Sequence, residues 1–390
     1  MTPAGGNIQT AAVRTAVASD RKVGRNFKLL GDSSIKKHLI AAAVAASFAA
    51  PAMAQNVTIS GYVEAGYQAL SHDRAATSYL QDITGVVGGI FGSSRLVIGG
   101  SEDLGGGLKA GFRLESSLDV TTGRFGSSSL GNQAGAGNGE IFNRGAEINL
   151  SGAFGMVRLG QFDHQGGENT DVNVVGNIAL ATGMSSQTTA TGVEIGTDRK
   201  SSIAYRSPTI NGFYAELQHS FADGQKTTST TESAAGSVSS VFAQYAAGPL
   251  EIRAGHATQK SMGLVTASND DAARTGVGVK VDFGIASASV HYAKATLVSQ
   301  VKNDEAVISV NIPMGNGLDL RAVYRNFDTD AAGATTTATA DNKEYTVALA
   351  KALSKRTSLF AAYTTQNRTS TDASAATDSE RFYLGVGHSF

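Results

Sequence analysis

Few of the residue types that carry chemistry stand in a useful arrangement in this chain of 390 residues. It contains no cysteine, which excludes disulfides, thiolate metal sites and cysteine nucleophiles. Asp163, His164 and Glu168 are the most suggestive metal-ligand group, but their spacing matches no known site, so we expect a solvated loop. The glycine-rich run 99–107 has no Gly-Lys-Ser/Thr ending and is not a phosphate-binding loop. No nucleophile, base and orienting group is recognisable, so the sequence predicts no catalytic residue, cofactor or bound metal.

The charged side chains are the remaining candidates, and many of them stand two residues apart. In 108–115, leucine, alanine and phenylalanine occupy one parity, whereas Lys109, Arg113 and Glu115 occupy the other. The same alternation occurs in 250–255 and 318–325. A β-strand directs alternate side chains to opposite faces, so each segment would have one apolar and one charged face. The total of 32 Lys and Arg against 33 Asp and Glu lacks the basic excess of a nucleic-acid binder.

Alternating segments recur about sixteen times along the chain. Their connections alternate between short turns rich in Gly, Pro, Asn or Asp and long polar loops. The predicted strands are 56–70, 93–102, 107–120, 141–151, 155–163, 201–208, 212–222, 238–247, 249–259, 273–283, 285–297, 304–314, 318–329, 342–353, 357–368 and 379–390.

These strands predict an all-β protein in a membrane. Many approach the nine to eleven residues that a tilted strand needs to cross a bilayer, and no run of eighteen apolar residues follows residue 54. An even number of strands closes an antiparallel barrel without an open edge. We therefore expect a transmembrane antiparallel β-barrel of about 16 strands, with short periplasmic turns and long extracellular loops. A secreted sandwich, propeller or solenoid is the alternative, but strands in soluble sheets average only five or six residues.

The N-terminal region predicts export. Lys36-Lys37-His38 precedes the apolar run 39–50, and the small-residue triplet Ala52-Met53-Ala54 follows. This order is typical of a signal peptide, which we place at 35–54 with cleavage after Ala54, giving a barrel domain at 55–390 in the outer membrane. A buried helix is the alternative. Residues 1–34 precede the usual start of such a signal, so we interpret them as an extension from a misassigned start site.

Several segments of the expected barrel resemble a known family. The resemblance rests on these stretches, in order along the chain: 56–66, 94–95 followed by 100–110, 142–144, 154–160, 205–208, 353–357 and 385–390. They are similar to the general porins of Gram-negative bacteria, specifically the trimeric sixteen-stranded group of beta-proteobacteria such as Neisseria, Bordetella and Burkholderia.

The resemblance implies a homotrimer that forms a passive diffusion channel for ions and small hydrophilic solutes. It also implies that the third loop folds into the barrel and narrows it, and that the outer surface contacts outer-membrane lipid and lipopolysaccharide. The terminal Phe390 would be recognised by the barrel-assembly machinery. The chain differs from the family pattern at Gln161-Phe162 and at Lys351, so the resemblance leaves the choice between anions and cations open.

The charged side chains on the second face of the strands are the candidate site residues. Sixteen strands enclose an aqueous interior, whereas Arg or Lys on the lipid face would cost about 2–4 kcal/mol at the midplane. The longest loop, about 164–199, is by resemblance the constriction loop. Its acids facing wall arginines would create a transverse field that sorts ions by charge. The candidate pore-lining residues are Arg95, Lys109, Arg113, Glu115, Arg158, Arg206, Arg321 and Arg325, and the candidate constriction-loop acids are Asp163, Glu168, Asp171, Glu194 and Asp198.

The alternative function is adhesion or surface recognition through the extracellular loops. The loops expected at 71–92, 121–140, 223–237 and 329–341 are rich in Gly, Ser, Thr and Ala. Binding hot spots favour Tyr, Trp and Arg, which are sparse in these loops. The composition therefore favours the pore.

Overall fold

The computed structural model falls into two units, residues 1–52 and Met53–Phe390. The expected N-terminal extension and signal peptide lie outside the described residues. The residues that the structure describes, all in the second unit, are 56–74, 82–125, 141–175, 199–221, 237–260, 271–296, 302–330, 340–370 and 377–390.

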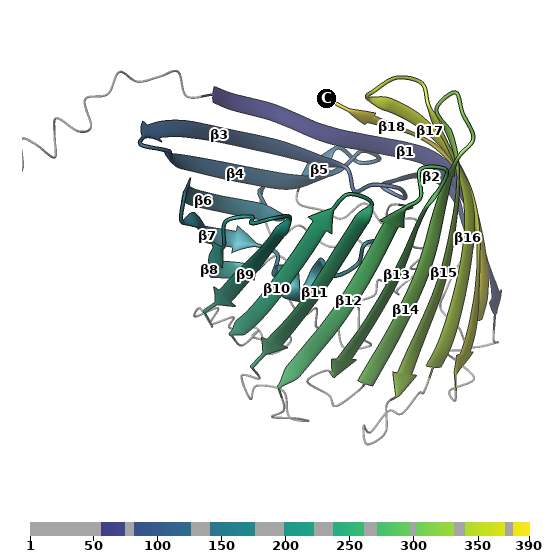
Figure 1. Ribbon diagram of the computed structural model, residues 1–390. Helices are drawn as coiled ribbons and strands as arrows, with labels where there is room; N and C mark the ends of the chain where they lie inside the picture. Colours follow the sequence, from purple (N-terminus) through teal and green to yellow (C-terminus); the bar gives the residue numbers. More distant parts are fainter. Residues whose placement is uncertain are drawn as a thin grey trace, which may run out of the picture. The chain divides into compact units, whose positions relative to one another are not determined.

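The described chain forms one closed antiparallel barrel (Figure 1). Of its eighteen strands, β2 (Ile83–Gly88) and β5 (Arg124–Phe125) are short additions, and the other sixteen each pair with a neighbour on both sides. The ring closes because β1 pairs with both β3 and β18. Gly61 and Phe390 also exchange two backbone hydrogen bonds of 3.0 and 3.1 Å. The barrel strands are β1 (Asn56–Arg74), β3 (Arg95–Gly105), β4 (Leu108–Asp119), β6 (Gly145–Gly152), β7 (Gly155–Phe162), β8 (Arg199–Arg206), β9 (Phe213–Ser220), β10 (Val238–Ala247), β11 (Leu250–Gln259), β12 (Ala272–Asp282), β13 (Ser287–Thr296), β14 (Lys302–Pro313), β15 (Leu318–Asp330), β16 (Ala340–Ala352), β17 (Thr357–Ser370) and β18 (Thr377–Ser389).

These sixteen strands confirm the predicted fold class and, within a few residues, the predicted segments. Tight turns join them at one end, and their backbone explains the glycines there. In the turn between β14 and β15, Gly315, Asn316 and Gly317 have φ of 84°, 50° and 69°. Glycine and asparagine adopt this left-handed conformation most readily. Within the described ranges no helix is long and apolar enough to span a membrane.

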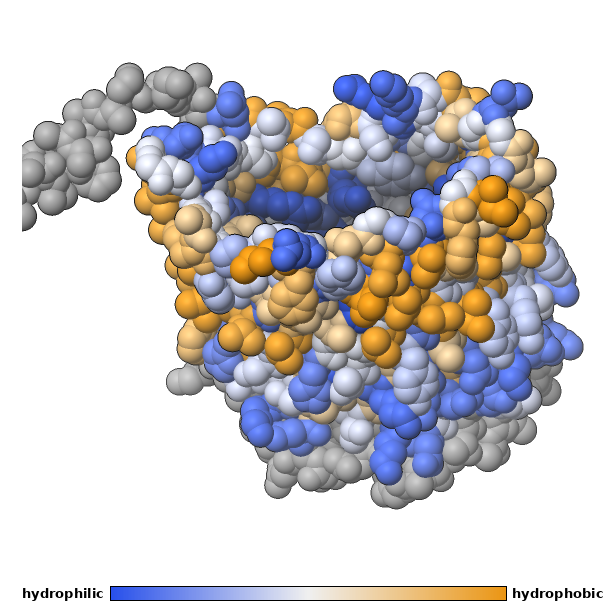
Figure 2. Space-filling view, viewed as in Figure 1, coloured by the Kyte–Doolittle hydropathy of each residue, from blue (hydrophilic) through white to orange (hydrophobic). Residues whose placement is uncertain are grey.

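The alternation of the sequence becomes an inner and an outer surface. Large apolar side chains of one parity are exposed on the outside, for example Ile59, Ile148 and Leu217. Figure 2 shows hydrophobic residues gathered over this outer surface and a hollow lined by hydrophilic residues. An apolar belt around a polar interior is the arrangement of a membrane barrel in contact with lipid.

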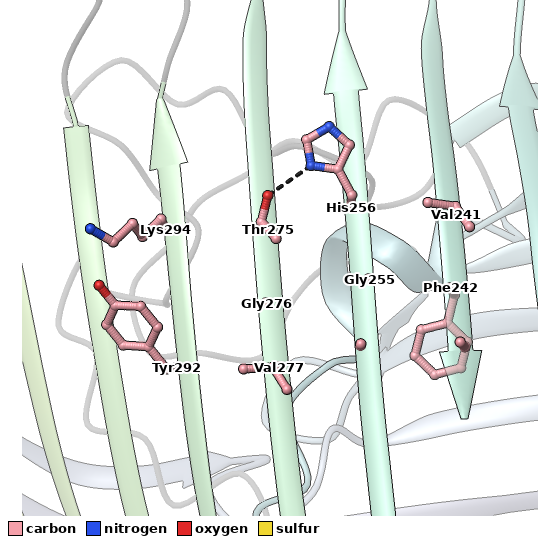
Figure 3. Close-up of a pocket in the computed structure, with 11 residues that line it drawn as sticks. Val241, Phe242, Gly255, His256, Thr275, Gly276, Val277, Tyr292 and Lys294 are labelled. Carbon is pink, nitrogen blue, oxygen red and sulfur yellow. Dashed lines mark hydrogen bonds between the residues drawn. The ribbon is translucent and has the colours of Figure 1, made fainter. Parts of the chain in front are cut away.

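A shallow depression of about 540 Å³ interrupts the outer surface over β10 to β13 (Figure 3). Its floor includes the backbone of Gly255 and Gly276, whose side-chain positions point to the inner side of the wall. At its edge His256 Nδ1 and Thr275 Oγ1 are hydrogen-bonded at 2.7 Å. The same two glycines are important on the inner side of the wall.

The second barrel strand is interrupted, which the sequence did not predict. β1 pairs with β3 through residues 56–62 and with β2 through residues 65–70. Between β2 and β3 the chain turns into the barrel, where Ile90 and Phe91 are buried. We refer to residues 89–94 as the strand insert. The expected loop at 71–92 is therefore wrong: its end forms β2 and the start of the insert, whose apolar side chains gain burial inside the barrel.

The strand insert belongs to an apolar cluster inside the barrel. Phe91 stacks on Phe360 with ring centroids 4.2 Å apart, and the ring centroid of Tyr383 lies 6.0 Å from that of Phe91. Val175 arrives from the loop after β7 and completes the contact with the inner wall. The interior is therefore not uniformly aqueous, because side chains fill the part next to β14–β18. The buried members are Val87, Ile90, Phe91, Val175, Val307, Val323, Ala348, Ala362 and Tyr383.

Candidate functional site

The chain folds into the barrel after β7. Residues 163–175, which we call the inner loop, include a single helical turn, α2 (Gln165–Glu168). This turn contacts β10, β11 and β12, and further along Val174 N donates a 3.0 Å hydrogen bond to Ser309 Oγ on β14. The described part of the expected constriction loop thus lies along the inner wall.

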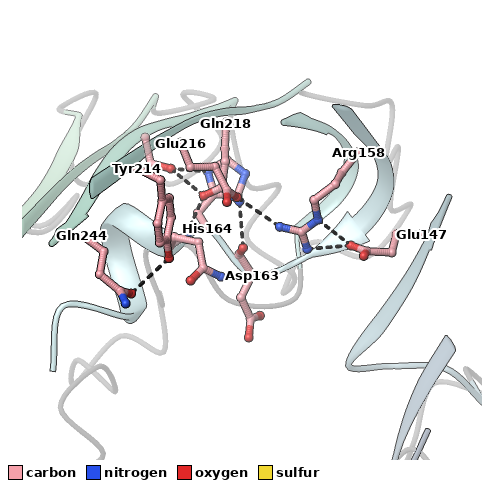
Figure 4. Close-up of polar contacts among 10 residues, drawn as sticks. Glu147, Arg158, Asp163, His164, Tyr214, Glu216, Gln218 and Gln244 are labelled. Carbon is pink, nitrogen blue, oxygen red and sulfur yellow. Dashed lines mark hydrogen bonds and ion pairs between the residues drawn. The ribbon is translucent and has the colours of Figure 1, made fainter. Parts of the chain in front are cut away.

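His164 fixes the point where the inner loop leaves the wall (Figure 4). It is fully buried, with Nε2 2.7 Å from Ser220 Oγ and Nδ1 3.1 Å from Ser240 Oγ. Gln218 accepts a hydrogen bond from Gln165 N at 2.5 Å and donates one to the Asp163 carbonyl at 3.1 Å. Both ring nitrogens therefore face serine hydroxyls. In the part of the chain that the structure describes, no group of three or more His, Asp or Glu could hold a metal ion.

Glycines on the inner wall make room for the loop. A Cβ added at Gly255 would lie 2.6 Å from Gly166 Cα, and one added at Gly276 or Gly278 would collide with Thr170. Real Cβ atoms do not approach this closely, so side chains at these positions would force the loop or the strands to move. Where the inner loop crosses β11 and β12, the positions that face it are therefore glycines.

Two arginines hold the backbone of the inner loop. Arg253 donates from Nη1 to the carbonyls of Asn169 and Asp171 at 3.4 and 3.2 Å. Arg321 donates from Nη1 to the Val175 carbonyl at 3.2 Å. Arg321, a predicted pore-lining residue, is therefore in direct contact with the loop.

A group of three arginines lies on the inner wall formed by β3, β4 and the residue before β6. Arg95 Nε is 3.7 Å and Arg144 Nε 2.9 Å from Glu115 Oε1, and Arg113 pairs with the other oxygen. The arginine side chains remain 39%, 48% and 33% exposed for Arg95, Arg113 and Arg144, whereas Glu115 is buried. One carboxylate serves three guanidinium groups, so this arginine group (Arg95, Arg113 and Arg144) carries an excess of positive charge.

Arg158 has a different environment (Figure 4). Its guanidinium pairs with Glu147 at 2.5 Å and with Glu216 at 3.0 Å, and it lies 4.2 Å above the Phe162 ring. Two carboxylates compensate its charge, and its side chain is only 16% exposed. Arg158 therefore braces the wall beside the inner loop and contributes no net positive charge.

The other predicted wall residues are spread along the barrel. Lys109 is exposed near the short turn between β3 and β4. Arg206 lies 3.7 Å above the Tyr214 ring, and Arg325 is largely buried with Nε 3.4 Å from Glu305. The structure brings Arg95, Arg113 and Glu115 together. Lys109, Arg206 and Arg325 lie outside that group.

The expected loop acids are only partly described. Asp163 and Asp171 lie at the start and the middle of the inner loop. Glu168 is in α2, but its side chain is not described, and Glu194 and Asp198 lie outside the described residues.

Sequence reasoning missed Arg144 because the predicted strand 141–151 put it on the same parity as the apolar Ile148 and Leu150, whereas β6 begins only at Gly145 and leaves Arg144 outside the strand. It also missed the path of the inner loop, for which Gly255, Gly276 and Gly278 on the lumen parity were the available signal.

Fold and lumen define the class: a β-barrel with an apolar outer belt, a loop folded inward and a charged inner wall. The chain matches the Gram-negative porin family over residues 41–372. It is 30% identical over 339 residues to outer membrane porin protein 32 of Delftia acidovorans, covering 84% of this chain and 88% of that protein. It is 26% identical over 286 residues to an outer membrane porin protein of Bordetella pertussis, covering 67% and 70%. The chain belongs to the Gram-negative porin family.

Solved structures agree on the fold. An anion-selective porin from Comamonas acidovorans aligns with a TM-score of 0.65 and 22% identity, covering 86% of this chain and all of that one. A trimer form of OmpT from Vibrio cholerae aligns with a TM-score of 0.59 and 14% identity, covering 86% and 100%. The resemblance to porins is confirmed. The protein is an outer-membrane porin, and its relatives are channels rather than enzymes. The adhesion alternative is not favoured.

Proposed function

We propose that the chain forms a water-filled channel for passive diffusion of ions and small hydrophilic solutes, and that the arginine group makes this channel prefer anions. The observation that carries the proposal is the set of three partly exposed guanidinium groups around the single buried carboxylate of Glu115. Charged side chains on a pore wall attract ions of the opposite sign and repel those of the same sign. The anion-selective porin of similar fold supports the same sign.

This proposal keeps the wall arginines of the sequence hypothesis and narrows them to one group. Arg158 is compensated by two acids, and Arg321 holds the inner loop. In the proposed transverse field, the negative charge opposite the arginines would come from Asp163 and Asp171 in the described inner loop, together with Glu168, Glu194 and Asp198.

The test is the reversal potential of the refolded protein in a planar bilayer under a KCl gradient. We expect the wild-type reversal potential to have the sign of a chloride-selective channel. It should shift toward zero in R113Q and further toward zero in R95Q/R113Q. The control is R356Q, which removes the same charge from an exposed turn between β16 and β17. A cation-selective wild type, or equal shifts in R113Q and R356Q, would contradict the proposal.

We also propose a homotrimer surrounded by outer-membrane lipid and lipopolysaccharide. The trimer form of the Vibrio cholerae protein of similar fold supports the assembly. Phe390 would be the assembly signal for the barrel-assembly machinery. Cross-linking of the unheated protein should give a trimer, and deletion of Phe390 should reduce its amount in the outer membrane without preventing refolding in detergent.

The proposed processing divides the chain at residue 54. Residues 35–54 would be the signal peptide, residues 1–34 an extension that is not translated, and 55–390 the mature barrel. N-terminal sequencing of the outer-membrane protein should begin at Gln55. A mature chain that retains residues before 55 would contradict this division.

A further inference from the structure

Arg95 differs from the other members of the arginine group in what its guanidinium contacts. Arg113 and Arg144 pair directly with the two carboxylate oxygens of Glu115. Arg95 Nε lies 3.7 Å from Glu115 Oε1, which is too long for a hydrogen bond. Within the ranges that the structure describes, the one hydrogen bond of the Arg95 guanidinium runs from Nη1 to the Ser93 carbonyl oxygen at 3.1 Å. The direction of this side chain therefore depends on Ser93, which belongs to the strand insert.

Both chain neighbours of Ser93 are bonded to Glu64 on β1. Gly92 N donates to Glu64 Oε2 at 2.9 Å, and Ser94 Oγ accepts from the backbone N–H of Glu64, also at 2.9 Å. Phe91 N adds a third hydrogen bond, to Glu64 Oε1 at 2.8 Å. Because Glu64 is buried, these hydrogen bonds lie in surroundings of low dielectric constant, where they are strong. The position of the Ser93 carbonyl is therefore set by Glu64.

Two other contacts of the strand insert do not involve Glu64. The Phe91 ring stacks on Phe360, and the Ser94 carbonyl accepts a 2.9 Å hydrogen bond from Leu118 N on β4. These contacts lie before and after Ser93 in the chain. A change at Glu64 should therefore loosen the middle of the insert and leave its ends attached.

We propose that Glu64 is a positioning residue for the ion selectivity of the channel, because it fixes the Ser93 carbonyl that holds Arg95 apart from Glu115. The inference rests on the anion preference proposed above. If the middle of the insert loosens, Arg95 loses its hydrogen bond and moves the short distance onto the Glu115 carboxylate. A guanidinium paired with a carboxylate attracts anions less strongly than one that faces the lumen without a carboxylate partner, so the preference for anions should fall.

The first measurement is the reversal potential of the refolded protein under a KCl gradient in the wild type, R95Q, E64Q and E64Q/R95Q. We expect E64Q to shift the potential toward zero by no more than R95Q does. When R95Q is already present, E64Q should cause no further shift toward zero, because the two residues act through one contact. E102Q is the matched control, since Glu102 is exposed on β3, and should leave the potential unchanged.

The sign of the shift separates positioning from simple electrostatics. E64Q removes a negative charge from the barrel, and this loss alone would strengthen the preference for anions and move the potential away from zero. A general loosening of the barrel would instead move it toward zero both with and without Arg95. Only a role through Arg95 gives a shift toward zero that disappears in R95Q.

The second measurement is a crystal structure of E64Q, which requires no current. We expect the Arg95 guanidinium to have left the Ser93 carbonyl and to lie within hydrogen-bond distance of Glu115. If E64Q does not fold, Y383F replaces it in both measurements. Tyr383 Oη donates to Glu64 Oε1 at 2.9 Å, so Y383F weakens the hold on the Glu64 carboxylate without changing any charge. Its shift toward zero should be smaller than that of E64Q and should also be absent in R95Q.

The outcomes distinguish this inference from the proposed function. An unchanged potential in E64Q and Y383F, or an equal shift toward zero with and without R95Q, overturns the role of Glu64 even if R95Q alone reduces the anion preference. An Arg95 side chain that keeps its place in the E64Q structure overturns it as well. Movement of Arg95 in E64Q, with no effect of R95Q on the potential, would support the link between Glu64 and Arg95 and contradict the proposed selectivity.

Discussion

Glu64 offers the sharpest test of how the strand insert is held. Its side chain is 1% exposed, and its two oxygens accept four hydrogen bonds. Oε1 accepts from Phe91 N at 2.8 Å and Tyr383 Oη at 2.9 Å, and Oε2 accepts from Gly92 N at 2.9 Å and Tyr62 Oη at 2.6 Å. The carboxylate therefore joins the insert to β1 and β18.

The substitution E64Q removes an acceptor without changing the size of the side chain. A glutamine has one carbonyl oxygen, so its amide group must face either Phe91 N or Gly92 N. A tyrosine hydroxyl can rotate and accept from the amide, but a backbone N–H cannot. One backbone donor is left without a partner, which costs about 2 kcal/mol and raises the opening equilibrium of the insert roughly thirtyfold.

The assay is hydrogen exchange followed by mass spectrometry on peptides that cover 85–94. We expect loss of protection in E64Q that is confined to these peptides, because the barrel strands keep their own hydrogen bonds. E102Q is the matched control, since Glu102 is exposed on β3. Equal protection of the insert in E64Q and the wild type would refute the reasoning.

Two further predictions follow from packing inside the barrel. G276V should push the inner loop away from the wall at Thr170 and destabilise the barrel by about 1–3 kcal/mol; single-channel conductance should change, whereas A247V, exposed at the end of β10, should leave it unaltered. F360A removes the ring stacked on Phe91 and should cost about 2–3 kcal/mol, less than for a fully buried phenylalanine because Phe360 is only partly buried. The loss is measured as a lower unfolding temperature; an unchanged temperature would show that the apolar cluster does not support the barrel.

The strands could be predicted from the sequence because lipid and water select different side chains at each position. In β15, Leu320 and Ala322 face outward while Arg321 and Val323 face the lumen, and a period of two records this choice directly. The same rule placed Arg95, Arg113 and Glu115 on one face. Their closeness then followed from pairing between β3 and β4, which are joined by a tight turn.

The parts that could not be predicted depend on contacts between distant segments. Glu64 bonds Tyr383, 319 residues away, and Arg321 bonds Val175, 146 residues away. Alternation fixes which face a side chain occupies, but it does not show which segment crosses the lumen to meet it. Val323 and Phe360 are therefore exceptions to the rule that the inner parity is polar, because they meet apolar groups of the insert and the inner loop.

These exceptions also bear on the route of solutes through the proposed channel. The apolar cluster fills the lumen next to β14–β18, and the inner loop covers the inner wall at β10–β12. The arginine group lies elsewhere on the wall, with Arg95 on β3, Arg113 on β4 and Arg144 just before β6. Its side chains stay partly exposed. Because water and ions need an unfilled path, we propose that the charged wall they meet in the channel is the one formed by Arg95, Arg113 and Arg144. On this proposal, the buried segments on one side of the barrel direct ions toward the arginines on the other side.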